Sequence, residues 1–300
     1  MVTVFYSPLY ASSGYAFDTT RKSEWLADSL KVTPIPGVEL RAPEPLDESR
    51  LSEVHDPRYI QAVKSGDPRD LAESQGFRWD AELWPMVMAS NGGAASAAIS
   101  AMQSKIAGSF SSGLHHARRE TGAGFCTFNG LVIAAHTALA SGDRFVLILD
   151  LDAHCGGGTF SLVANNPGIW HLDVSVASYD CYRPSERTTL DIVHDAERYL
   201  PTIEKRLAEL ELGAPRFDLC LYNAGMDSHE DCDIGGMQGV TRDMLASRER
   251  IVFEWCRERN IPVAFVLAGG YTGGRLEKAA LVDLHRLTLH AAIDSLGETG

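Results

Sequence analysis

The sequence predicts an α/β fold with a mostly parallel central sheet, and three observations support this prediction. Several short apolar runs are continuous, which is typical of strands that are buried on both faces of a sheet. Helical patterns lie between these runs, and the alternation of strand and helix favours parallel pairing with helices on both faces. Polar clusters follow three of the runs directly, at the position where open α/β sheets bind ligands.

The predicted strands are short apolar runs at 2–6, 145–149, 217–222 and 262–267, with 169–174 as a fifth candidate. The predicted helices are alanine-rich or have apolar residues three and four positions apart: 92–102, 128–139, 192–212, 242–259 and 276–296. The chain has no internal repeat and no flexible linker. Residues 1–300 are therefore expected to form one domain.

Composition and charge disfavour several classes of protein. The 300 residues are 45% hydrophobic, enough for a globular core, and the net charge of −13 argues against binding to nucleic-acid phosphates. An acidic surface favours cationic partners, such as polyamines or lysine-rich peptides. No segment is apolar enough to span a membrane, and no secretory signal is visible. Six scattered cysteines without a CxxC pair favour a reducing compartment, the cytoplasm.

A compact group of candidate metal ligands follows the predicted strand 145–149: Asp150, Asp152 and His154. Alternate residues of an extended chain share one face, so these two carboxylates and the imidazole are expected in a row. Oxygen and nitrogen ligands of this kind suit a divalent metal, first of all zinc. The alternative is an aspartate that caps the next helix and a histidine buried in the core.

Two further polar clusters follow the strands 217–222 and 262–267, and they contain Asp227 and Tyr271. Parallel strands end at one edge of a sheet, so both side chains are expected to approach His154. Taken alone, Asp227 could cap a helix and Tyr271 could be an ordinary core tyrosine.

A glycine-flanked loop carries two adjacent histidines, His115 and His116, out of ten in the chain. Histidine titrates near neutrality, and loops on a rigid scaffold often carry catalytic groups. The pair is therefore a candidate for acid–base chemistry, with a surface or capping pair as the alternative.

Together these segments resemble a known family. The stretches GLHHARRETGAGFCTFN, DLDAHCGGGT, NAGMD and LAGGY are similar, in order and spacing, to those of the histone deacetylase and acetylpolyamine amidohydrolase superfamily. The resemblance extends from about Tyr6 to about Val282 and includes LSEVHDPRYIQAVKSG. It implies a three-layer α/β/α fold of the arginase and deacetylase type. It also implies zinc-dependent hydrolysis of an N-acyl amide, with acetyl-lysine or an acetylated polyamine as substrate.

The resemblance further implies roles for single residues. Asp152, His154 and Asp227 would bind one zinc ion and leave a coordination position for water. His116 would be the general base and acid. His115 would be its electrostatic partner, and Asp150 would orient His115 and contribute to a potassium site. Tyr271 would donate a hydrogen bond to the oxyanion. The residues implied at the substrate are Gly124, Phe125, Gly269 and Gly270, with Tyr179 or Tyr182 opposite Phe125.

Departures from the family pattern affect this prediction. Gly157 stands where many members have a carboxylate or amide that partners the second histidine, so His116 is expected to lack a partner. Cys155 replaces a histidine and could be a small core residue or an oxidation-sensitive thiol. By spacing, Asp173 falls at the position of a serine that helps to coordinate potassium, which weighs against that ion. The stretch 185–199 lacks the family's usual Asn-Val-Pro-Leu strand.

Other functions share part of this evidence. A dimanganese ureohydrolase of the same fold would need further carboxylates where the chain has Gly156 and His229. A non-catalytic, metal-containing binder of acyl-lysine gains some support from Gly157. A serine hydrolase is disfavoured because the chain has no G-x-S-x-G motif. The sequence does not predict the oligomeric state, and a dimer is compatible with it.

Overall fold

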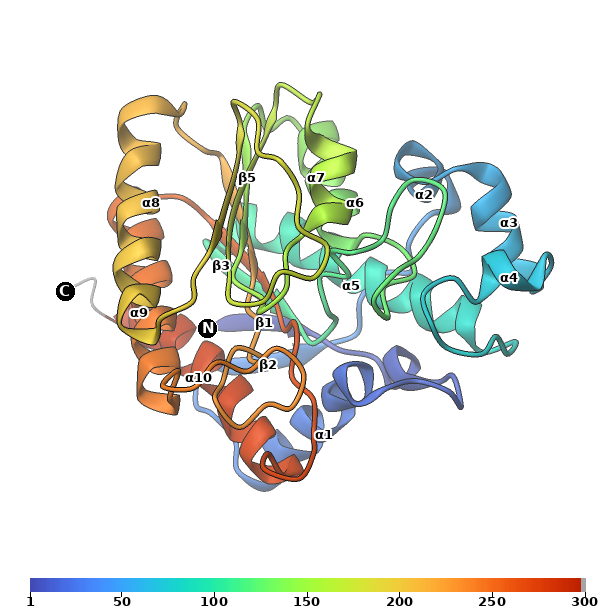
Figure 1. The fold of residues 1–300 in the computed structure, drawn as a ribbon, viewed down its shortest axis with the longest axis horizontal. Helices are drawn as coiled ribbons and strands as arrows, with labels where there is room; N and C mark the ends of the chain where they lie inside the picture. The colour runs from blue at the N-terminus through green and yellow to red at the C-terminus, as the bar shows by residue number, and fades with distance from the viewer. Residues whose placement is uncertain (298–300) are drawn as a thin grey trace.

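The computed structural model describes residues 1–297 and is built around an eight-stranded sheet (Figure 1). The strand order is β2-β1-β3-β8-β7-β4-β5-β6, and all neighbouring strands are parallel. The strands are β1 (Val2–Phe5), β2 (Val38–Arg41), β3 (Ile106–Ser109), β4 (Val146–Asp150), β5 (Ile169–Ser175), β6 (Thr188–Ile192), β7 (Leu219–Asn223) and β8 (Val263–Val266). The predicted α/β fold with a parallel sheet is confirmed.

Helices cover both faces of this sheet and make the fold a three-layer α/β/α structure (Figure 1). One layer contains α1 (Asp18–Val32), α8 (Tyr199–Gly213), α9 (Arg242–Glu258) and α10 (Lys278–Gly297). The other contains α2 (Glu48–Val54), α3 (Pro57–Ser65), α4 (Arg69–Ala72), α5 (Leu83–Ser104), α6 (Gly130–Ala140) and α7 (Gly157–Val163). Within residues 1–297, no helix combines the length and the apolar character that crossing a membrane requires.

The two hydrophobic cores follow from the alternation of side chains along the central strands. In β4, Leu147 and Leu149 contribute to the core under α8 and α9, whereas Val146 and Ile148 contribute to the core under α5 and α6. All five residues of β4 are buried. A strand that is covered on both faces has to be apolar throughout, which explains the continuous runs in the sequence.

The candidate site lies where four adjacent strands of the sheet end. β3, β8, β7 and β4 are neighbours, and their carboxyl ends lead into the segments with the histidine pair, Tyr271, Asp227 and Asp152, respectively. Open α/β sheets bind ligands at this edge.

The structure also contains elements that the sequence did not predict. The strands β2 and β6 lie at the two edges of the sheet and are only partly buried, so they lack a continuous apolar pattern. β6 falls within 185–199, although the family's usual strand sequence is missing there. The helix predicted for 192–212 begins only at Tyr199, because β6 and a short 3₁₀ turn capped by Asp195 precede it.

Candidate metal centre and active site

Asp152, His154 and Asp227 lie together at the end of β4 and β7, and all three are buried. One ligand atom from each side chain lies within 4.8 Å of the others. His154 Nδ1 is 3.2 Å from Asp152 Oδ1 and 3.1 Å from Asp227 Oδ2. Backbone groups fix both carboxylates, because His154 N–H donates to Asp152 Oδ1 and Ala153 N–H donates to Asp227 Oδ1, each at 3.0 Å.

The chemistry of these three side chains fits a divalent cation. Burial and the negative charge of Asp152 raise the pKa of Asp227. Burial lowers the pKa of His154, but the carboxylates of Asp152 and Asp227 outweigh this effect and raise it to about 10. Two buried carboxylates that repel each other and share one imidazole are best neutralised by a cation. Zinc accepts these oxygen and nitrogen ligands.

Glycines let the backbone approach the three candidate ligands closely. Gly269 has a φ of +54°, and a Cβ there would overlap the carboxylate of Asp227. A Cβ at Gly235, which has a φ of +96°, would lie 2.8 Å from His154 Cε1. Both positions combine a left-handed backbone with no room for a side chain, so glycine is required.

His115 is held by Asp150, which lies outside the group of three. His115 Nδ1 is 2.7 Å from Asp150 Oδ2, and Asp150 Oδ1 accepts from Asn223 Nδ2 at 2.7 Å. Burial lowers the pKa of His115, but Asp150 and Asp152 outweigh it and raise the pKa to about 10. His115 is therefore an imidazolium at neutral pH. Asp150 is the last residue of β4 and groups with other buried side chains, those of His171 and Asp173.

His116 has a carboxylate partner, so the expectation drawn from Gly157 is wrong. His116 Nδ1 is 3.0 Å from Asp180 Oδ2, in the loop that follows β5. A Cβ at Gly157 would lie 2.7 Å from Asp180 Cγ, so the glycine leaves the space that the aspartate occupies. Asp180 lies 64 residues after His116 in the sequence, and no local pattern in the sequence indicates that the two side chains meet.

Asp180 is fixed by more than the histidine. Its φ is +59°, a left-handed conformation that aspartate tolerates better than most residues. Gly158 N–H donates to Asp180 Oδ2 at 3.1 Å, and Arg118 donates to Asp180 Oδ1 and to the carbonyl of Gly157. The carboxylate is therefore held in place from three sides.

The two histidines, His115 and His116, differ in their charge at neutral pH. Burial, followed by the positive charge of His115, lowers the pKa of His116 to about 4. His116 is therefore neutral at neutral pH, whereas His115 is charged. A pair of adjacent titratable groups with pKa values driven apart is a common arrangement for acid–base chemistry.

The loop with the histidine pair is anchored by two residues for which sequence analysis assigned no role. His55, from the LSEVHDPRYI stretch, has Nδ1 2.8 Å from the carbonyl oxygen of Arg118, and its Nε2 accepts from Asn129 N–H at 2.9 Å. The Asn129 side chain caps α6 and donates to the carbonyl of Ala117 at 3.2 Å and to Thr159 Oγ1 at 3.0 Å. These contacts fix the loop against α6 and α7.

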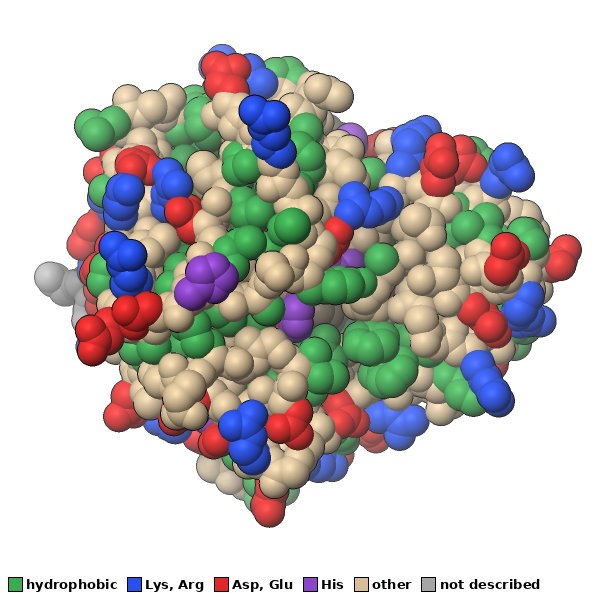
Figure 2. Space-filling view, viewed as in Figure 1, with side chains coloured by type: hydrophobic (Ala, Val, Ile, Leu, Met, Phe, Trp, Pro, Cys, Tyr) green, Lys and Arg blue, Asp and Glu red, His purple; other side chains and the backbone are tan. Residues whose placement is uncertain are grey.

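Aromatic rings surround the approach to the histidines. Tyr179 lies edge-on to His116, with ring centroids 4.9 Å apart, and is 51% exposed. Tyr182 stacks instead on Phe160 and His171, so Tyr179 is the tyrosine that faces the site. Figure 2 shows histidine side chains inside a hollow whose border is largely hydrophobic.

Phe125 and Tyr271 lie near each other, with ring centroids 6.1 Å apart. Gly124, before Phe125, has a φ of +50°, and a Cβ there would overlap the ring of His116. Burial, together with the charges of Asp227 and Asp152, raises the pKa of Tyr271, so its hydroxyl remains a hydrogen-bond donor. Gly270, before Tyr271, has a φ of +94°.

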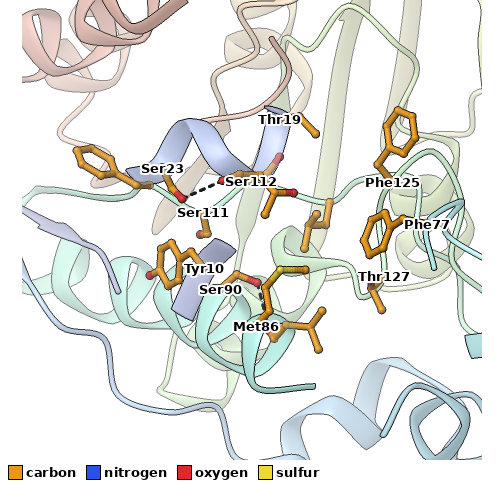
Figure 3. A pocket seen from close by; sticks show the side chains of 14 residues that line it. Tyr10, Thr19, Ser23, Phe77, Met86, Ser90, Ser111, Ser112, Phe125 and Thr127 are labelled. Atoms are coloured by element: carbon orange, nitrogen blue, oxygen red, sulfur yellow. Dashed lines mark hydrogen bonds between the residues drawn. The ribbon is translucent and has the colours of Figure 1, made fainter. Parts of the chain in front are cut away.

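A cavity that sequence analysis did not anticipate lies beside Phe125. Phe77, Met86 and Leu114 contribute its apolar lining, and Tyr10 and Ser111 lie toward its other end (Figure 3).

A second group of buried side chains with metal-binding chemistry consists of Asp150, His171 and Asp173. Asp173 Oδ1 accepts from Ser175 Oγ at 2.5 Å, so a serine does lie beside this group. Burial and the charge of Asp150 raise the pKa of Asp173 to about 7.

Two other residues of uncertain role have simple surroundings. Cys155 is buried, and burial raises the pKa of its thiol to about 12, which favours a core residue over a reactive thiol. His229 accepts from Asp231 N–H through Nδ1, as a loop histidine does.

Comparisons with known proteins show which family the chain belongs to. The sequence model of a protein family, the histone deacetylase domain, matches residues 16–287 of this chain. An uncharacterised protein of Picosynechococcus sp. is 32% identical over 84% of both chains, and histone deacetylase 2 of Arabidopsis thaliana is 28% identical over 76% of this chain and 62% of its own.

Solved structures share the fold. Acetylpolyamine aminohydrolase from Burkholderia pseudomallei has a TM-score of 0.80 and 17% identity, covering 97% of this chain and 98% of its own. The HD domain of HDA15 has a TM-score of 0.78 and 18% identity, and the match covers 99% of this chain and 90% of its own. The family model, which matches most of the chain, carries the conclusion: this protein belongs to the histone deacetylase family.

Proposed function

We propose that the protein is a zinc-dependent deacylase that hydrolyses an N-acyl amide, with acetyl-lysine or an acetylated polyamine as the substrate. The observation that carries the proposal is the position of Asp152, His154 and Asp227 beside one neutral and one charged histidine. Membership of the histone deacetylase family supports a hydrolase of amide bonds.

Asp152, His154 and Asp227 would hold the metal. Zinc, when bound, would polarise the acyl carbonyl and lower the pKa of a water molecule to about 7. The three ligands come from two rigid strand ends, and backbone N–H groups orient both carboxylates. Outer contacts of this kind orient metal ligands in many sites.

His116 would move the proton. Asp180 accepts a hydrogen bond from Nδ1–H, which leaves the lone pair on Nε2 free to accept a proton from water. The same nitrogen would then protonate the leaving amine. His115, fixed as an imidazolium by Asp150, would add positive charge near the reacting groups.

Tyr271 would donate its hydroxyl to the acyl oxygen as negative charge develops there. Phe125 and Tyr179 would enclose the linear part of the substrate, with the backbone of Gly124, Gly269 and Gly270 close to it. Aromatic rings exclude water around an aliphatic chain and leave its charged end in solvent.

A ureohydrolase is less well supported than a deacylase. Gly156 offers no ligand, and His229 is a loop histidine in contact with Asp231 N–H. The reading as a non-catalytic binder loses its main support, because His116 has the carboxylate partner that Gly157 does not provide.

The test combines elemental analysis with an activity panel. We expect about one zinc per chain in the purified protein and turnover of at least one substrate among acetyl-lysine peptides, acetylated polyamines and longer acyl-lysines. A protein without stoichiometric metal that leaves the entire panel intact would refute the proposal.

A further inference from the structure

Arg248 is the largest fully buried side chain in residues 1–297, and it lies in the middle of α9. This helix packs between α8 and α10 on one face of the sheet (Figure 1). A guanidinium is always charged, and its transfer out of water costs several kcal/mol even after relaxation. Its position inside the core therefore requires an explanation.

The guanidinium is paired within the helix. Arg248 Nε and Nη2 donate to Glu249 Oε1 at 3.0 and 2.7 Å, and both residues are 0% exposed. Tyr222 donates its hydroxyl to the same carboxylate oxygen at 2.6 Å. The pair is thus neutral as a unit and is tied to β7 through Tyr222.

The remaining contacts of Arg248 point to the two segments that carry the candidate metal ligands. Nη1 donates to the carbonyl oxygen of Leu151 at 3.1 Å, and Leu151 lies between Asp150 and Asp152. Nη2 contacts Met226 Sδ at 3.6 Å, and Met226 directly precedes Asp227. Nη1 also contacts the Tyr199 hydroxyl at 3.1 Å.

The two ligand segments touch each other at the same place. A Cβ at Gly225 would lie 3.0 Å from the carbonyl oxygen of Leu151 and would overlap Asp152 Cα. One rigid fork of donors therefore contacts both segments where they meet. A flexible or point-like cation could not hold two such acceptors in a fixed relation.

We propose that Arg248, held by Glu249, is a positioning residue that sets the relative position of Asp152 and Asp227 and thereby the metal site. A buried ion pair can often be replaced by apolar residues without loss of stability. The contacts of this pair with both ligand segments therefore favour a positioning role over a contribution to stability. The inference rests on the proposed function, because it assumes that the three ligands hold a metal.

The experiment compares Arg248→Met, Arg248→Lys and the double variant Arg248→Met/Glu249→Gln with the parent protein. The readouts are zinc affinity by competition with a chelator, the visible spectrum of the Co²⁺-substituted protein, which reports ligand geometry, and kcat and KM at saturating zinc. We expect zinc affinity to fall about 10-fold in Arg248→Met, the lower end of the effect of removing a group bonded directly to a metal ligand, because Arg248 contacts the neighbours of the ligands. The Co²⁺ spectrum should change and kcat should fall more than KM changes. Arg248→Lys should recover only part of the affinity.

Arg242→Met is the matched control, because Arg242 lies on the same helix and pairs with Asp283 at the surface. It should leave zinc affinity and the Co²⁺ spectrum unchanged. If Arg248→Met does not fold, the double variant, which has no buried guanidinium, and Arg248→Lys carry the test. Zinc affinity and a Co²⁺ spectrum equal to those of the control would overturn the inference. A parent protein that binds no zinc would instead refute the proposed function.

Discussion

Asp180→Asn is the substitution that tests the proposed acid–base chemistry most directly. Asp180 accepts from His116 Nδ1, from Gly158 N–H and from Arg118. Asparagine has one acceptor oxygen in place of two, so its NH₂ group has to face either the imidazole or the guanidinium. If it faces His116, Nδ1 becomes an acceptor and the proton moves to Nε2, where a base needs a lone pair. If it faces Arg118, two donors oppose each other.

The expected loss of kcat in Asp180→Asn follows from the burial of the hydrogen bond between His116 and Asp180. The side chains of His116 and Asp180 are 6% and 10% exposed, so solvent screens their hydrogen bond little. A hydrogen bond to a charged group contributes about 1.5–3 kcal/mol. Since about 1.4 kcal/mol corresponds to a factor of ten in rate, kcat should fall about 10- to 150-fold. KM should change less, because His116 acts on the reacting atoms.

The assay is steady-state kinetics at saturating zinc, with the zinc content and thermal midpoint measured for each variant. Asp191→Asn is the control, since Asp191 also pairs with an arginine, Arg206, but lies away from the histidines. A fully active Asp180→Asn enzyme with normal zinc content would show that the His116–Asp180 contact has no part in catalysis.

Three further outcomes are expected. Tyr271→Phe should lower kcat about 10²- to 10³-fold with little change in zinc content, because one oxyanion donor is lost; retention of full kcat would exclude that role. Asp227→Asn should lose stoichiometric zinc by elemental analysis, and a variant that still holds one zinc per chain would contradict the assigned ligand set. In the metal-free parent, an NMR titration should show the His116 imidazole neutral at pH 6, since it gains a proton only as the pH falls toward its pKa of about 4. The His115 imidazole should stay charged until the pH approaches about 10, and a midpoint near 6.5 for either ring would contradict the assignment.

The central part of the fold was predictable because burial on both faces leaves a strong signal in the sequence. β4, β7 and β8 lead into the candidate metal ligands and Tyr271, and their apolar runs stand out without any structural information. β3 leads into the histidine pair and was not predicted, because its four buried residues end in Gly108 and Ser109 and form no long apolar run. β2 and β6 lie at the sheet edges, where partial exposure permits polar residues and removes that signal.

The candidate site was predictable where its residues follow strands directly. Asp152, Asp227 and Tyr271 each lie a few residues after a strand end, so the parallel topology alone brings them to one edge. Asp180 and Arg248 were not predictable, because their contacts depend on how a loop folds back and on how one helix packs. Neither produces a periodicity or a motif.

The carboxylate partner of His116 comes from position 180 and not from position 157, and this affects how relatives are compared. A side chain at position 157 and the carboxylate of Asp180 would occupy the same space, so a chain cannot acquire one before it gives up the other. We therefore expect the residues at these two positions to differ together among relatives, and a glycine at position 157 does not by itself show that His116 lacks a partner.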